Sequence, residues 1–91
     1  INNIMIFKKE NRVKLVTFLR TLKSNKVVDD IDNYWKLIGE NATIIDVGTN
    51  DYFNGKVLLL FDKDLDIFKV ANHNPIKNSL WINIYDLELI E

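Results

Sequence analysis

The fold of this 91-residue chain is decided by residues 41–62, which read NATIIDVGTNDYFNGKVLLLFD. The stretch opens with β-branched residues over 41–47, passes through turn-forming residues at 48–51 and reaches the Asn54-Gly55 pair. Asn-Gly suits a tight hairpin because both of its residues tolerate positive φ. Residues 56–62 are so apolar that we expect both faces of this segment to be covered. The stretch therefore predicts two antiparallel strands joined by a turn.

The remainder of the carboxyl-terminal half continues this pattern. Residues 65–70 predict a further strand, and 71–75 predict a loop because their proline forbids regular strand pairing. Residues 80–85 alternate between apolar and larger polar or aromatic side chains, and 87–90 predict a last short strand. We therefore expect residues 41–91 to form a sheet of short antiparallel strands.

The amino-terminal half predicts two helices. Apolar residues recur at three- and four-residue spacing after Asn11, which is the period of an amphipathic helix, and Asn11 is a suitable cap. A second start signal follows at Asp29-Asp30, and we expect Gly39 to end that helix in a left-handed conformation. The predicted buried faces are Leu15, Phe18, Leu19 and Leu22 in the first helix, and Ile31, Tyr34, Trp35 and Ile38 in the second.

These patterns predict one α+β domain over residues 1–91, with a helical part at about 11–39 and an antiparallel β part at 41–91. Two amino-terminal helices would pack on a small, strongly curved antiparallel sheet. The β part contains Asn41-Ala42-Thr43-Ile44-Ile45, the hairpin entry Asn54-Gly55-Lys56-Val57, the strand end Phe61-Asp62, and the closing segments Trp81-Ile82 and Asp86-Leu87-Glu88. With these segments it resembles an SH3-like small barrel or half-barrel. The aromatic groove of proline-peptide-binding SH3 domains is not recognisable in them, so the resemblance implies the fold and not that activity.

The composition excludes several kinds of site. The chain has no cysteine, which excludes disulfide scaffolds, zinc fingers and thiol catalysis, and its one histidine is His73. Asp62, Asp64 and Asp66 begin like a calcium loop, but Ile67 stands where the loop needs glycine and His73 where it needs glutamate. No apolar run approaches the length of a membrane span. We expect no metal, no cofactor, no membrane partner and a cytoplasmic location.

The formal net charge of −1 conceals two opposed halves. Residues 1–27 hold seven basic residues and one acid, a net charge of +6, whereas residues 28–91 hold five basic residues and twelve acids, a net charge of −7. This division indicates either a charged partner or two halves that face each other in the fold.

The candidate residues favour binding over catalysis. His73 lies in a loop without a recognisable nucleophile or second acid–base group beside it, and the isolated glycines form no phosphate-binding loop. We therefore predict a non-catalytic, stoichiometric inhibitor, such as a bacterial toxin-immunity protein or a phage-encoded inhibitor. Its acidic and aromatic surface would meet a basic toxin or nuclease domain. The residues predicted to form that surface are Asp51, Tyr52, Asp62, Asp64, Asp66, His73, Trp81 and Tyr85.

The alternative is a nucleic-acid-binding accessory protein whose cationic amino-terminal helix lies along a phosphate backbone. Its contacts would come from Arg12, Lys14, Arg20 and Lys23. An enzyme would come into question if His73 lay beside a carboxylate in a closed pocket. The sequence also leaves open whether the helices cover the side of the sheet that carries Trp81 and Tyr85.

Overall fold

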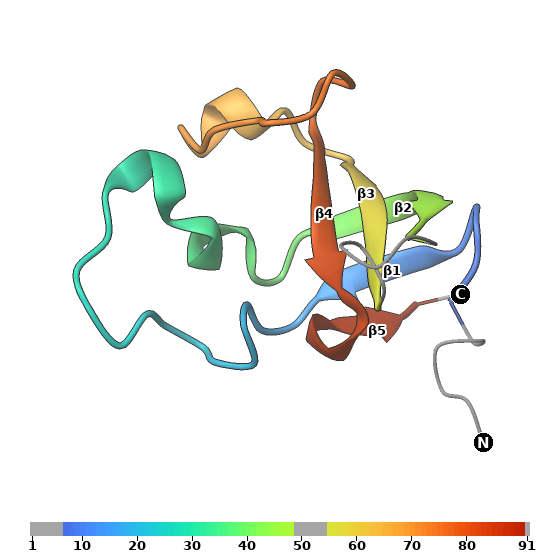
Figure 1. Cartoon of the computed structure of the whole chain (residues 1–91), viewed down its shortest axis with the longest axis horizontal. Coiled ribbons are helices and arrows are strands. Elements are labelled where there is room, and N and C mark those ends of the chain that lie inside the picture. The colour runs from blue at the N-terminus through green and yellow to red at the C-terminus, as the bar shows by residue number, and fades with distance from the viewer. Residues whose placement is uncertain (1–6, 49–54, 91) are drawn as a thin grey trace.

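A computed structural model describes residues 7–48 and 55–90, which form a five-stranded antiparallel sheet in the order β4-β3-β2-β1-β5 (Figure 1). In Figure 1, β3 and β4 cross β1 and β2 at a steep angle, so the sheet is strongly curved. The register between β2 and β3 shifts between Ile44 and Asp46, and such a bulge bends a strand. The strands are β1 (Arg12–Leu15), β2 (Asn41–Val47), β3 (Lys56–Phe61), β4 (Ser79–Asn83) and β5 (Leu87–Leu89).

The hydrophobic core lies inside the curve of the sheet and is made by alternate residues of its strands together with residues of the connecting segments. In β1, Val13 and Leu15 are fully buried, while Arg12 and Lys14 point outward. In β4, Leu80 and Ile82 are buried in the same way. This alternation follows from the two-residue period of a strand. The other buried members of the core are Phe7, Leu37, Ala42, Ile44, Val57, Leu59, Phe61, Leu65, Val70, Ile84 and Leu87.

The prediction of two amino-terminal helices, and with it the α+β class, is wrong. The described part of the chain contains no α-helix and is mostly β-structure. Its helical turns are single 3-10 turns: η2 (Asp30–Asp32), η3 (Tyr34–Leu37), η4 (Leu65–Ile67) and η5 (Ile84–Asp86).

The first predicted helix is replaced by β1 and an irregular segment. Leu15 is fully buried, but Leu19 and Leu22 are 55% and 73% exposed, so the apolar stripe is not one buried face. Leu19 and Arg20 adopt φ of 51° and 66°, which a right-handed helix does not allow. Asn11 caps a turn instead, because its side-chain oxygen accepts from the Lys8 amide.

The second predicted helix is reduced to η2 and η3. Its predicted face is wrong in part, since Ile31 is 56% exposed, whereas Leu37, which was not assigned to that face, is fully buried. Gly39 ends the segment with φ of 97°, which confirms the predicted left-handed stop. Its amide donates to the Leu15 carbonyl and ties the end of the segment to β1.

The strand predictions in the second half are confirmed with one exception. β2, β3, β4 and β5 overlap the predicted segments 41–47, 56–62, 80–85 and 87–90. The predicted strand at 65–70 is wrong, because the Asp64 side chain accepts from the Asp66 amide and starts η4. Gly55 has φ of 82°, as the hairpin prediction requires, while Asn54 lies outside the described residues. Within residues 7–48 and 55–90, no helix is long and apolar enough to cross a bilayer.

Candidate functional site

A buried carboxylate fixes the start of the long connection between β1 and β2. This connection spans residues 16–40 and is called the excursion. Asp86, in η5, is 1% exposed, and it accepts hydrogen bonds from the Thr17 hydroxyl at 2.7 Å and from the amides of Leu19 and Arg20 at 3.1 and 2.8 Å. Its own carbonyl accepts from the Val16 amide at 2.8 Å. Asp86 therefore imposes the backbone path of residues 16–20, which turns Phe18 toward the excursion's other aromatic side chains.

Three aromatic residues of the excursion form a cluster. The ring of Phe18 lies 5.5 Å from that of Tyr34 and 4.9 Å from that of Trp35, the second pair meeting edge to face. Edge-to-face contact is a favoured aromatic geometry. The Trp35 indole N–H donates to the Thr21 hydroxyl, so the cluster also holds the segment that follows Phe18.

The cluster is joined to the segment after η4. The Tyr34 hydroxyl donates to the Ala71 carbonyl at 2.7 Å, and the Lys36 ammonium donates to the Phe68 carbonyl at 2.6 Å. Burial, with a smaller contribution from the Asp32 carboxylate, raises the pKa of the Tyr34 hydroxyl above its ordinary value of 10.0. The hydroxyl therefore remains a donor at neutral pH and keeps the Tyr34 ring in place.

Asparagine side chains shape the loop that leads into β4. The Asn72 amide donates to the carbonyls of Asn74, Ile76 and Ser79, and its oxygen accepts from the Asn78 amide. The Asn74 side chain also donates to the Ser79 carbonyl at 2.8 Å. In the described sheet, β4 has no neighbouring strand on the side away from β3. At the start of β4, side chains of the loop supply the hydrogen bonds that a neighbouring strand would otherwise make.

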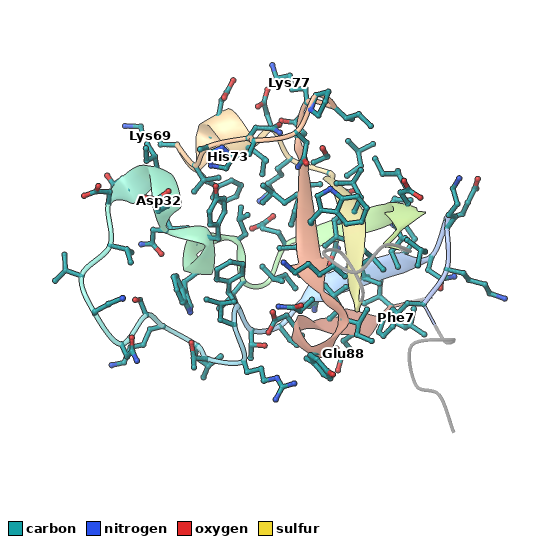
Figure 2. The ribbon with its side chains drawn as sticks, in the orientation of Figure 1. Phe7, Asp32, Lys69, His73, Lys77 and Glu88 are labelled. Atoms are coloured by element: carbon teal, nitrogen blue, oxygen red, sulfur yellow. The ribbon has the colours of Figure 1, made fainter. Side chains whose placement is uncertain are left out.

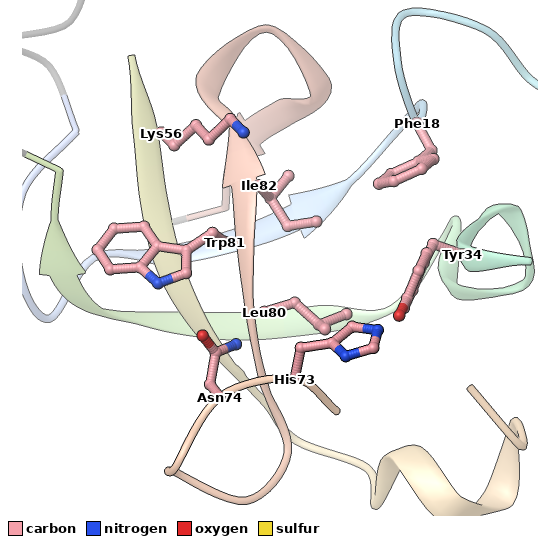
Figure 3. Close-up of a pocket in the computed structure, with 8 residues that line it drawn as sticks. All are labelled: Phe18, Tyr34, Lys56, His73, Asn74, Leu80, Trp81 and Ile82. Carbon is pink, nitrogen blue, oxygen red and sulfur yellow. The ribbon is translucent and has the colours of Figure 1, made fainter. Parts of the chain in front are cut away.

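These elements enclose a groove of about 380 Å³ along β4 (Figure 3). Leu80 and Ile82, both nearly fully buried, belong to its apolar lining. Figure 3 shows Phe18 and Tyr34 on one side of β4, with Trp81 and Lys56 on the other and His73 and Asn74 on the loop below. Its size falls within the range of small binding pockets. It can receive one or two apolar side chains of a partner against aromatic walls. Its full lining is Phe18, Tyr34, Lys56, His73, Asn74, Leu80, Trp81 and Ile82.

Two of the predicted site residues, His73 and Trp81, therefore lie in one groove. His73 is exposed at the rim and Trp81 is half-buried. The excursion lies across the groove from Trp81 but does not cover Tyr85, which is 63% exposed and outside the lining. Asp51 and Tyr52 fall outside the described residues.

The three predicted aspartates do not line the groove and are largely neutralised. Asp62 forms a two-pronged ion pair with Arg12, at 2.6 and 2.7 Å. This pair lowers the pKa of Asp62 and raises that of Arg12. Asp64 and Asp66 lie 3.6 and 3.8 Å from the Lys77 ammonium, which is visible near the top of Figure 2. The acidic tip thus carries three carboxylates and two cations.

The four cations of the nucleic-acid alternative do not share a helix face, since the helix is absent. Arg12 is paired with Asp62, and Lys14 lies opposite Glu88 in the register of β1 and β5. The Arg20 guanidinium stacks 3.9 Å above the Tyr85 ring. Lys23 lines a separate cavity with Lys26 and Trp35. The structure therefore distributes these side chains over different places.

The sequence pattern places Phe18 and Tyr34 on predicted helix faces and does not distinguish Asn74 or Asp86 from their neighbours. The local signal for Asp86 was weak: it stands between Tyr85 and Leu87 in a segment that also holds Asn83 and Glu88. An acid that is buried between apolar neighbours usually has hydrogen-bond partners. The repeated asparagines at 72, 74 and 78 were likewise a signal for a loop closed by side chains.

The described residues contain no cluster of three or more side chains suited to hold a metal ion. Comparison of the chain with protein-family models, with curated proteins and with solved structures found no match.

Proposed function

We propose that the chain is a non-catalytic protein-binding module that takes one or two apolar side chains of a partner into the groove beside β4. In this role it would act as a stoichiometric inhibitor, as a bacterial toxin-immunity protein or a phage-encoded inhibitor does. Occlusion of the partner's working surface would be the mechanism. A curved sheet of five short antiparallel strands is compatible with the proposed likeness to SH3-like small barrels.

One observation carries the proposal: the groove combines buried aliphatic side chains with three aromatic ones that remain partly accessible. Leu80 and Ile82 are 6% and 2% exposed, while Phe18, Tyr34 and Trp81 are half-buried. Aromatic residues around a desolvated pocket are typical of the positions that dominate protein interfaces. The walls are also pre-formed, since Tyr34 is held by Ala71 and Phe18 by its ring contacts. Pre-formed walls reduce the entropy cost of binding.

The lining supports binding more than chemistry. Its polar groups are Lys56, His73, Asn74, the Tyr34 hydroxyl and the Trp81 indole N–H. The Tyr34 hydroxyl and the Asn74 amide already donate to carbonyls of this chain. A general base needs a reacting proton within hydrogen-bond reach in a positioned site, whereas His73 stands at an open rim. These polar groups suit the orientation of a bound segment.

The structure changes which surface we propose. The acidic tip at Asp62, Asp64 and Asp66 is paired with Arg12 and Lys77, so its remaining charge is small. We therefore propose that the groove makes the apolar contacts with the partner. The acidic tip would contribute only electrostatic attraction that guides the partner during association.

The test is selection of 12-residue peptides from a random display library against the whole chain, followed by calorimetric titration of the selected peptides. We expect peptides that carry a large apolar residue, and we expect Trp81→Ala to weaken their binding by about tenfold to a hundredfold. Tyr85→Ala is the matched control, since Tyr85 is an exposed aromatic residue outside the groove. The proposal fails if no peptide is selected, or if Trp81→Ala and Tyr85→Ala weaken binding equally while both variants keep the native circular dichroism spectrum.

A further inference from the structure

The loop that follows Phe18 combines cations with exposed apolar side chains. We define the cationic loop as residues 19–28, which read LRTLKSNKVV. The whole stretch from residue 11 to residue 28 has no acidic residue. In Figure 1 this loop, coloured from blue to cyan, extends away from the strands on the side opposite to the two chain ends.

The apolar side chains of the cationic loop are turned to solvent. Val27 is 99% exposed, Leu22 is 73% exposed and Leu19 is 55% exposed. Burial of a leucine or valine side chain away from water lowers the free energy. Because these side chains are exposed in the free protein, that gain is still available for binding. Single exposed apolar residues are ordinary on protein surfaces, whereas apolar side chains combined with cations in one segment are typical of sequences that lie at a membrane interface.

Two lysines stand beside these apolar side chains. Lys23 and Lys26 are exposed, and within the described part of the chain no carboxylate lies at ion-pair distance from either. Both line a shallow cavity of about 400 Å³ together with Trp35 and Lys36. Lys36 already donates to the Phe68 carbonyl, so the ammonium groups offered to an outside anion are those of Lys23 and Lys26.

The positive charge of the amino-terminal segment is not cancelled within the fold. Among residues 7–48 and 55–90, the Arg12–Asp62 pair is the one ion pair that joins the basic segment 1–27 to the acidic remainder. The other ion pairs in these ranges connect residues of the acidic remainder with one another. The two halves do meet in the sheet, since β1 lies between β2 and β5, but no ion pair among the described residues neutralises Lys23 or Lys26 there. These two lysines of the cationic loop are left to act on something outside the chain.

We propose that the cationic loop docks on an anionic lipid bilayer surface, with Leu22 and Val27 at the boundary of headgroups and acyl chains and Lys23 and Lys26 at the headgroup phosphates. Peripheral attachment of this kind needs no membrane span, since it combines buried apolar area with attraction to anionic lipid. A nucleic-acid backbone would satisfy the lysines but would leave Leu22 and Val27 without an apolar partner. This inference goes beyond the proposed function and does not depend on the groove.

The experiment is co-sedimentation of the whole chain with vesicles of phosphatidylcholine alone and of phosphatidylcholine containing about 30% phosphatidylglycerol. We expect binding to the anionic vesicles only. Lys23→Gln with Lys26→Gln is expected to weaken that binding about thirtyfold, because each lysine near an anionic surface contributes about 1 kcal/mol. Leu22→Ser with Val27→Ser keeps every charge and is expected to weaken it at least about tenfold.

Matched controls lie elsewhere on the molecule. Lys63→Gln with Lys69→Gln removes two exposed lysines, and Ile67→Ser with Ile76→Ser removes side chains that are 66% and 48% exposed. Neither control should change vesicle binding. The inference is overturned if the chain ignores anionic vesicles, if the controls weaken binding as much as the loop variants, or if the Leu22 and Val27 variant binds as well as the native chain. Retention of a single-stranded RNA oligonucleotide in place of vesicles would also overturn it, in favour of a nucleic-acid partner.

Discussion

The Asp86 carboxylate accepts a 2.7 Å hydrogen bond from the hydroxyl of Thr17, sixty-nine positions earlier in the chain. The same carboxylate accepts hydrogen bonds from the backbone amides of Leu19 and Arg20, and both of these residues adopt positive φ. Phe18 lies between these anchored residues and forms one wall of the groove. The groove therefore depends on a contact between the two ends of the sheet-forming sequence.

Replacement of Asp86 by alanine should destabilise the protein strongly. The change leaves a hydroxyl and two partly buried amides without their acceptor, and we expect the free energy of unfolding to fall by about 2–4 kcal/mol. Asp86→Asn, which keeps an acceptor oxygen, should cost less. Urea denaturation measures both, with the exposed Glu88→Ala as a control expected to change stability by no more than about 0.5 kcal/mol. A loss for Asp86→Ala no larger than that of the control would contradict the anchoring role.

The Arg12–Asp62 pair predicts a specific acid dependence of stability. The pKa of Asp62 is lowered in the folded protein from its ordinary value of 3.8, chiefly by the hydrogen bonds from Arg12. A lowered folded pKa gives stability that is present above the unfolded pKa and lost as pH falls through the folded one. The advantage of the native protein over Asp62→Asn should therefore be complete at neutral pH and disappear in acid below about pH 4.

The size of this effect is small, because the Arg12 and Asp62 side chains are 35% and 47% exposed and solvent screens the pair. We expect no more than about 1 kcal/mol. Urea denaturation at a series of pH values measures it, with Asp30→Asn as the control, since Asp30 is 82% exposed and 4.0 Å from its partner Lys36. If the difference in free energy of unfolding between the native protein and Asp62→Asn grew as the pH was lowered, the proposed role of the ion pair would be contradicted.

Gly39 and Asn78 both adopt positive φ, and replacement of either one should destabilise the protein, for different reasons. Gly39 has φ of 97° with open space where a Cβ would lie, so Gly39→Ala costs only backbone strain, about 1–2 kcal/mol. Asn78 also has positive φ, at 65°, but its side chain accepts from the Leu65 amide at 2.9 Å. Asn78→Gly should therefore destabilise the protein even though it relieves strain. Thermal unfolding measures both variants, and stabilisation by either one would count against these local structures.

Leu37 and Ile31 distinguish the observed segment from the helix that the sequence suggested. Leu37 is fully buried and Ile31 is 56% exposed. Leu37→Ala should cost about 2–5 kcal/mol, whereas Ile31→Ala should stay within about 0.5 kcal/mol. A helix with the predicted face would reverse this order. Chemical denaturation of the two variants side by side decides between the two arrangements.

The β half could be predicted because its signals are local. The β-branched run at 41–47 and the alternation at 80–85 each specify their own structure within a few residues. Gly55 adopts the positive φ expected of an Asn-Gly pair, while Asn54 lies outside the described residues. The segment 12–22 carries two periods at once, because Val13 and Leu15 fit a strand while Leu15, Phe18 and Leu22 fit a helix. The hydrogen bonds from Thr17, Leu19 and Arg20 to Asp86 favour the strand and the irregular segment over the helix. No pattern within segment 12–22 indicates that its hydrogen-bond acceptor lies near the other end of the chain.

The same reason limits prediction of the site. His73 and Trp81 could be proposed from composition and alternation, whereas Phe18 and Tyr34 reach the groove only through the unexpected path of the excursion. The partners of the acidic tip, Arg12 and Lys77, became known only with the fold: Arg12 stands fifty positions before Asp62. Long-range pairs of this kind changed the proposed surface from the acidic tip to the groove.

If the groove beside β4 is the partner-binding surface, a bound peptide must change the environment of the residues that line it. Titration of the isotope-labelled chain with a selected peptide, followed by amide chemical shifts in solution, measures this change residue by residue. We expect the largest shifts at Tyr34, His73, Leu80 and Trp81, with little change at Asp64, Asp66 and Tyr85. Largest shifts at the acidic tip with an unperturbed groove would contradict it.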